Sequence, residues 1–81
     1  MMTYLSKVSV ANELMIYTYG LTSDKIDGLI EINRLDFSKK VKFTLASGDT
    51  SRGYHMERAI ASMFTYHQNN VFPDYDLRAS G

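Results

Sequence analysis

The chain of 81 residues contains no cysteine and only one proline, and it has no net charge. The absence of cysteine excludes a disulfide framework, a thiolate zinc site and a cysteine nucleophile. Nine basic residues balance nine acidic ones, so the chain has no surplus of positive charge with which to bind nucleic acid through counterion release. A neutral chain also lacks the charge repulsion that keeps copies of a small protein apart.

Long hydrophobic runs are missing as well. No segment approaches the roughly 20 apolar residues that a membrane-spanning helix needs, and the N-terminal MMTYLSKVSV lacks the basic and apolar regions of a signal peptide. We therefore expect a cytoplasmic protein without a membrane segment. A hydrophobic content of 44% and a charged content of 22% are typical of a globular protein. We expect one small domain, residues 1–81, with a modest core.

One segment, Thr50–Asn70, has a sustained helical period. At about 100° per residue, its apolar residues fall on one side of a helix, and that side must be buried. The apolar stripe comprises Met56, Ala59, Ile60, Met63, Phe64 and His67. Asn70 can adopt the left-handed conformation that closes a helix, and Pro73 prevents the helix from continuing. We expect residues 74–81 to form a tail that frays at its end.

Four segments before the helix have the composition and alternation of β-strands. They are Tyr4–Val10, Leu14–Tyr19, Gly28–Leu35 and Val41–Leu45. Short connections favour an antiparallel meander, with the C-terminal amphipathic helix packed on one face. The sequence thus predicts an α+β fold with a four-stranded antiparallel sheet. The strand residues predicted for the core are Val8, Val10, Ile16, Ile30, Ile32, Val41, Phe43 and Leu45.

One helix covers only one face of a sheet, so the composition of the other face matters. If Ile16 points into the core, its neighbours in the strand point away from it. The outward residues are then Met15, Tyr17, Tyr19 and, on the next strand, Leu29. Such a face is more apolar than exposure to solvent requires, and tyrosine and methionine are enriched in interfaces. Scattered exposed tyrosines are the ordinary alternative. From this face we predict a small non-enzymatic interaction module that forms a homodimer or binds another protein.

The loop Ser47–Gly53 suggests a second hypothesis, a binding site for phosphate or another anion in a small binding protein or enzyme. The loop leads from a strand into a helix N-terminus, where free N–H groups bind anions. The candidate binding residues are Thr50, Ser51, Arg52, His55 and Arg58. The spacing matches neither a P-loop nor a dinucleotide motif, and Asp49 would compete for the same donors. A plain capped loop is the simpler interpretation.

A third hypothesis is the binding of single-stranded nucleic acid, with bases stacking on Tyr17 and Tyr19. Both tyrosines lie on one strand and the chain is neutral, which makes this less favourable than protein binding. The two histidines, His55 and His67, are too far apart along one helix to share a metal. We expect His67 to pack at the edge of the core, and the sequence contains no metal, cofactor or catalytic motif.

Overall fold

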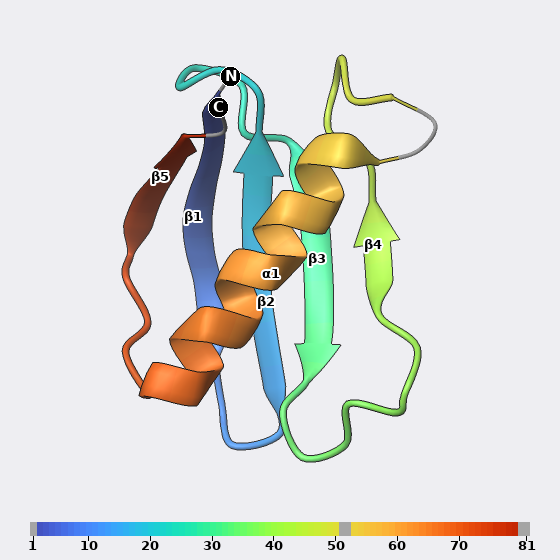
Figure 1. Cartoon of the computed structure of the whole chain (residues 1–81), viewed down its shortest axis with the longest axis vertical. Coiled ribbons are helices and arrows are strands. Elements are labelled where there is room, and N and C mark those ends of the chain that lie inside the picture. The colour runs from blue at the N-terminus through green and yellow to red at the C-terminus, as the bar shows by residue number, and fades with distance from the viewer. Residues whose placement is uncertain (1, 51–52, 80–81) are drawn as a thin grey trace.

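The computed structural model describes residues 2–50 and 53–79, which form one helix packed on one antiparallel sheet (Figure 1). The strands are β1 Met2–Val10, β2 Leu14–Gly20, β3 Gly28–Asn33, β4 Lys42–Thr44 and β5 Tyr75–Ala79, and the helix is α1 Tyr54–Asn69. The strand order is β4-β3-β2-β1-β5, with every neighbouring pair antiparallel. The predicted α+β class, with an antiparallel sheet and one helix, is confirmed.

β5 lies within residues 74–81, where the sequence pattern predicts a tail rather than a strand. The strand pairs with β1 and makes the sheet five-stranded rather than four-stranded. Tyr75 and Leu77 lie on the face away from α1, whereas Asp76 lies on the helix side, opposite a buried residue of β1. There the Asp76 carboxylate accepts a hydrogen bond from the Tyr66 hydroxyl. Asp76, whose charge would oppose burial on the helix side of a sheet, therefore has a hydrogen-bond partner there.

α1 crosses the sheet diagonally and packs mainly against β1, β2 and β3 (Figure 1). β4 lies beside the helix rather than under it, and all three of its residues are exposed. Phe43 stands opposite Ile30 in the β3–β4 ladder, so it points to the helix side, yet it is 49% exposed. The prediction that Phe43 belongs to the core was wrong, because the helix does not reach over β4.

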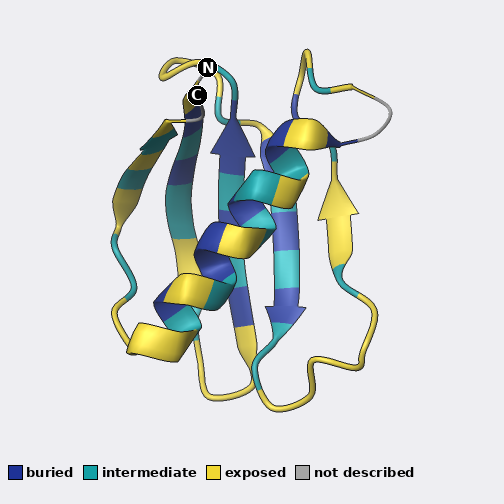
Figure 2. Ribbon diagram, in the orientation of Figure 1, coloured by how far each residue is buried: buried dark blue, intermediate teal, exposed yellow. Residues whose placement is uncertain are grey.

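The core lies between α1 and the central strands (Figure 2). Its buried hydrophobic residues are Leu5, Met15, Tyr17, Tyr19, Ile30, Ile32, Ala46, Ala59, Met63 and Tyr66. Ile30, Ile32 and Met63 confirm the predicted core. The helix buries a stripe rotated slightly from the predicted one, since Ser62 and Tyr66 are buried while Ile60 is only partly buried.

β2 faces the opposite way from the prediction. Met15, Tyr17 and Tyr19 are fully buried under the helix, whereas Ile16 is half-buried on the other face, opposite Glu31. Apolar residues occupy both sides of this strand, so alternation alone does not identify the inner side. The tyrosines suit the inner side because each hydroxyl finds an acceptor at the margin of the core. Tyr17 donates to the carbonyl oxygen of residue 73 at 2.6 Å, and Tyr19 donates to a carboxylate at 2.7 Å.

A bulge in β1 explains a second error in the predicted core. The register with β2 shifts between Lys7 and Ser9, so Val8 is the extra residue, and it is 55% exposed. Before the bulge Leu5 is buried against the helix, and after it Val10 packs against the core. The sequence pattern placed Val8 and Val10 on one continuous inner side, which the bulge interrupts.

Candidate functional site

Asp49 caps the N-terminus of α1. Its carboxylate accepts hydrogen bonds from the backbone N–H groups of Thr50 (2.9 Å), His55 (3.2 Å) and Met56 (3.1 Å), and from the Tyr19 hydroxyl (2.7 Å). Four hydrogen bonds use the acceptor positions that a carboxylate offers. Burial raises the pKa of Asp49, but the hydrogen bonds to its ionised form, the one from Tyr19 foremost, outweigh burial and hold the pKa below its usual value.

Tyr19 reaches this helix end because Gly28 leaves room for its ring. The two residues stand opposite each other in the β2–β3 ladder, and a Cβ at Gly28 would lie 2.3 Å from the ring. The Tyr19 hydroxyl donates to Asp49 and accepts a hydrogen bond from the N–H group of Ala46 at 3.0 Å. Burial, followed by the hydrogen bond to Asp49, raises the pKa of Tyr19 well above its usual value. At neutral pH the hydroxyl keeps its proton, as any tyrosine with a pKa of about 10 or above does, and donates it to Asp49.

The structure brings only part of the predicted anion site together. Asp49 occupies the N–H groups that an anion would use, so the free donors that motivated this site are already bound. Thr50 and His55 line one hollow. Arg58 does not line this hollow; it is half-buried, and its guanidinium is 5.7 Å from the centroid of the Tyr54 ring. The other two candidates lie outside the described residues: Ser51 and Arg52.

His55, one of the candidate anion-binding residues, is buried. Its side chain is only 6% exposed. The imidazole Nδ1 lies 2.8 Å from Oγ1 of Thr3, a fully buried residue of β1. This contact joins two residues that are 52 positions apart in the chain. Because the two side chains hydrogen-bond to each other, both polar groups can be buried between α1 and the sheet.

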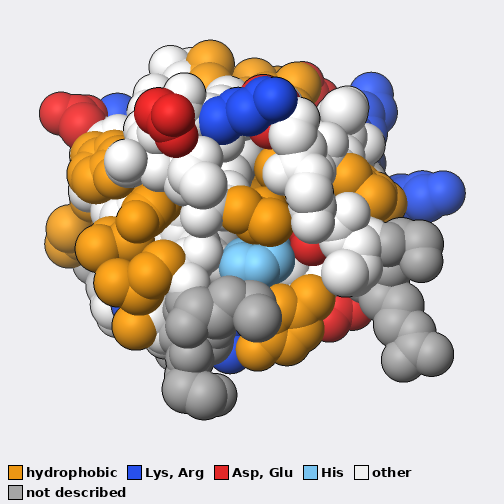
Figure 3. Space-filling model, turned by 90° about the horizontal axis from the view of Figure 1, so that it is seen from above, with side chains coloured by type: hydrophobic (Ala, Val, Ile, Leu, Met, Phe, Trp, Pro, Cys, Tyr) orange, Lys and Arg blue, Asp and Glu red, His pale blue; other side chains and the backbone are white. Residues whose placement is uncertain are grey.

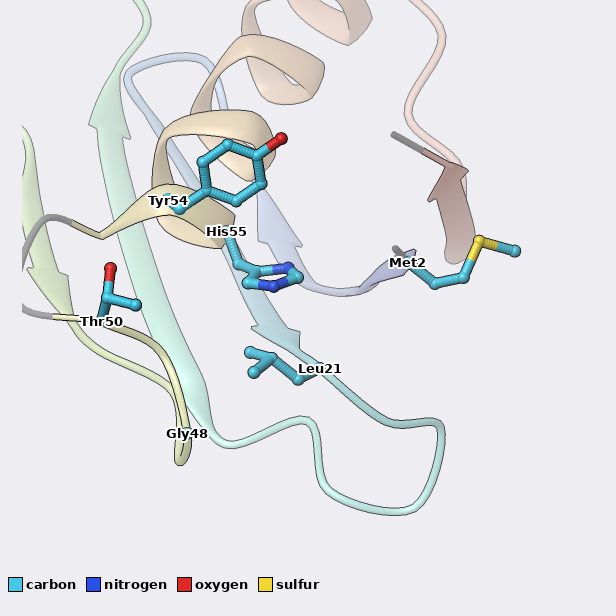
Figure 4. A pocket seen from close by; sticks show the side chains of 6 residues that line it. All are labelled: Met2, Leu21, Gly48, Thr50, Tyr54 and His55. Carbon is cyan, nitrogen blue, oxygen red and sulfur yellow. The ribbon is translucent and has the colours of Figure 1, made fainter. Parts of the chain in front are cut away.

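A hollow of about 420 Å³ opens beside His55, where the start of α1 meets the start of β1 and the end of β2. Its lining residues are Met2, Leu21, Gly48, Thr50, Tyr54 and His55. Figure 4 shows the imidazole between the side chains of Leu21 and Tyr54. In the view from above, a histidine side chain is visible among hydrophobic ones (Figure 3). The hollow is thus mainly apolar, with one imidazole in its wall.

His67 lies at the opposite end of α1 and is half-buried, as expected for a residue at the core edge. Its Nδ1 accepts a hydrogen bond from Nε of Arg34 at 3.3 Å. The ring of Phe37 packs edge-on against the imidazole, with 4.9 Å between the centroids. Arg34 also lies over the ring of Phe72, 4.7 Å from its centroid. These contacts give His67 a structural role in fixing the β3–β4 connection to the helix.

The face of the sheet opposite α1 carries different residues from those predicted. Three of the four interface candidates, Met15, Tyr17 and Tyr19, are fully buried on the helix side. Their assignment to the open face was wrong, so a partner protein cannot reach them, nor can a base stack on the two tyrosines. Leu29 does lie on the open face, opposite Thr18 of β2.

Other apolar side chains occupy that face. We call it the outer face and define it by Tyr4 of β1, Ile16 of β2, Leu29 of β3, and Tyr75 and Leu77 of β5. Tyr4 and Leu77 stand directly opposite each other in the β1–β5 ladder. Tyr75 is 52% exposed and Leu77 is 43% exposed. Two of the five residues come from β5, so the sequence pattern could reveal this face only after β5 had been recognised as a strand.

Comparison with known proteins gives no match: no family model fits the sequence, and no curated protein or solved structure is significantly similar to it. Within the described residues, no helix combines the length and apolar character that crossing a bilayer requires. In the same part of the chain, no three side chains of the types that bind metals come together as a cluster.

Proposed function

We propose that this protein is a small interaction module that associates with a second copy of itself through the outer face. The observation that supports this proposal is a row of apolar and aromatic side chains on a sheet face that α1 leaves uncovered. Tyr75 and Leu77 are about half exposed, and association would remove them from water. Apolar surface of this kind commonly marks contact sites, and tyrosine is enriched among interface residues that contribute most to binding.

A second copy is favoured as the partner by charge and by size. The chain is neutral, so two copies do not repel each other. On the outer face itself, Glu31 stands directly opposite Lys42, and the two charges balance. The broad side of the molecule measures 30 by 23 Å. The area of a face with these dimensions is on the order of the roughly 800 Å² that each partner contributes to a standard interface.

Two-fold symmetry makes the outer face suitable for contact with itself. In such a dimer each residue of the patch meets the same patch on the partner, so one substitution changes the interface twice. Thr18, a polar residue between the apolar ones, does not oppose this packing. Thr18 donates its hydroxyl to the Ser6 carbonyl oxygen at 3.2 Å, so that donor is already bound within the sheet.

Sedimentation equilibrium of the full chain at micromolar concentration tests the proposal. We expect a dimer for the parent protein and a folded monomer for Leu77→Glu. The matched control is Phe43→Glu, because Phe43 is a similarly exposed apolar strand residue that points to the helix side at the other edge of the sheet. This control should remain dimeric. A monomeric parent, or a dimer that Phe43→Glu disrupts while Leu77→Glu does not, would show that the outer face is not the interface.

A further inference from the structure

The hollow beside His55 has an unused hydrogen-bonding group in its wall. The Thr3 hydroxyl is fully buried, and Nδ1 of His55 is its hydrogen-bond partner within residues 2–50 and 53–79. A buried hydroxyl donates its proton to the acceptor that is available. Nδ1 is therefore the acceptor in this pair. In a neutral imidazole the ring proton then resides on Nε2.

The Nε2–H group has no hydrogen-bond partner in the part of the chain that the structure describes. It belongs to a side chain that is only 6% exposed and that lines a hollow of about 420 Å³. This volume falls within the range of roughly 300–1,000 Å³ typical of small-molecule sites. The wall combines apolar side chains with a few polar groups, the imidazole of His55 and the hydroxyls of Thr50 and Tyr54, which is the usual composition of such sites.

The charge beside the hollow decides which ligands fit. The Asp49 carboxylate binds the backbone N–H group of His55 itself, at 3.2 Å, so an anion entering the hollow would meet a fixed negative charge. Asp49 already accepts four hydrogen bonds, so it has no acceptor position left for a cationic or donor-bearing ligand. An anion is therefore repelled, and a cation gains no hydrogen bond from Asp49, whereas the Nε2–H donor of His55 requires an acceptor.

We infer that this hollow binds a small, neutral and largely apolar molecule that carries one carbonyl-type acceptor, which takes the hydrogen bond from Nε2–H of His55. The side chains of Leu21 and Tyr54 pack against the apolar body of the ligand. This site is separate from the outer face and does not depend on the proposed dimer.

The test is an NMR titration of the isotope-labelled full chain with three probes: acetophenone, ethylbenzene and benzoate. Acetophenone carries the acceptor, ethylbenzene has the same apolar body without it, and benzoate adds negative charge. We expect acetophenone to shift the His55 ring resonances and the methyl resonances of Leu21. Ethylbenzene should bind about fivefold more weakly, as expected for one missing hydrogen bond, and benzoate should bind more weakly than acetophenone.

A double variant, Thr3→Val with His55→Phe, supplies the control. It replaces both members of the buried pair by apolar groups of similar shape, which avoids leaving one polar partner unsatisfied. We expect it to bind acetophenone and ethylbenzene with equal affinity. The inference is overturned if none of the probes shifts the parent's resonances at millimolar concentration. It is equally overturned if ethylbenzene or benzoate binds the parent as tightly as acetophenone does.

Discussion

Single side chains at the start of α1 connect the helix to the sheet. Tyr19 projects from β2 across Gly28 and donates to Asp49, which in turn binds two N–H groups of the first helical turn. Gly53, the residue before the helix, has a left-handed conformation (φ 63°) and gives no side-chain cap. Asp49 therefore performs from a distance the role that the residue preceding a helix usually has.

Replacing Asp49 by alanine should destabilise the fold. The helix loses its cap, and the Tyr19 hydroxyl loses its acceptor, so the combined cost should be about 2–4 kcal/mol of unfolding free energy. Urea unfolding of the two proteins measures the difference. Asp24→Ala is the matched control, since Asp24 is an exposed aspartate in the β2–β3 connection, and its substitution should change the free energy by less than about 0.5 kcal/mol. Similar values for both variants would contradict the capping role.

Three buried tyrosines predict a loss of stability at high pH. Burial, followed by the charges of Asp74 and Asp76, raises the pKa of Tyr17 to about 12, and burial also raises the pKa of Tyr19 and of Tyr66 above the usual value. A tyrosine whose pKa is higher in the folded state contributes stability that is complete below the unfolded pKa of about 10. That stability is lost as the pH rises through the folded pKa.

We therefore expect the free energy of unfolding to fall as the pH rises above about 10. In Tyr17→Phe the decline should be shallower, because one of the three tyrosines no longer titrates. Urea unfolding at a series of pH values measures both slopes, and tyrosinate absorbance follows the ionisation. Equal slopes in the parent and the variant would exclude Tyr17 as a contributor.

At the scale of elements, the chain's local patterns indicate where strands and the helix lie better than which way they face. The predicted helix Thr50–Asn70 agrees with α1, and the four predicted strands overlap β1 to β4. The direction of β2 was wrong because Leu, Ile and Thr on one side and Met and two Tyr on the other are almost equally apolar. Gly28 indicates the correct direction of β2, because a glycine opposite Tyr19 leaves space for an aromatic ring on the inner side.

The sequence pattern did not predict β5 or the hollow, for a different reason. Both depend on contacts between distant parts of the chain. β5 is stable as an edge strand because Asp76 meets Tyr66, a residue of α1. The hollow exists because the start of β1 brings Thr3 to His55. Alternation in the sequence of β5 is visible, but nothing in the local pattern shows that its charged residues find partners beneath the helix.

The direction of β2 can be tested by one pair of substitutions. Tyr17→Glu puts a carboxylate into a fully buried position and removes the contact with the Tyr66 ring, 5.3 Å away between centroids, so we expect no cooperative folding. Ile16→Thr changes the neighbouring residue on the outer face to another β-branched one, and the protein should stay folded. Circular dichroism during heating distinguishes them. A folded Tyr17→Glu with an unfolded Ile16→Thr would reverse the assigned faces.

At the scale of the molecule, residues 2–50 and 53–79 form two layers, in which one face of the sheet is covered. α1 shields the inner face (Figure 2), while the outer face remains exposed, and β4 and β5 form the two edges of the sheet. A chain of 81 residues buries only about 60–65% of its unfolded surface, so its margin of stability is small. Association of two outer faces would add a second apolar layer to a fold that has one.

Association through the outer face should therefore stabilise the folded state in a way that depends on concentration. Because only folded copies present the intact patch, the dimer shifts the folding equilibrium by mass action. Over a hundredfold range of protein concentration the melting temperature of the parent should rise by about 5 °C.

Leu77→Glu, which removes an apolar residue from the outer face, should melt at the same temperature throughout that range. Phe43→Glu should keep the concentration dependence of the parent even if its melting temperature differs. Differential scanning calorimetry at three concentrations gives the result, and a parent melting temperature that does not change with concentration would mean that the folded chain is stable without a partner on this face.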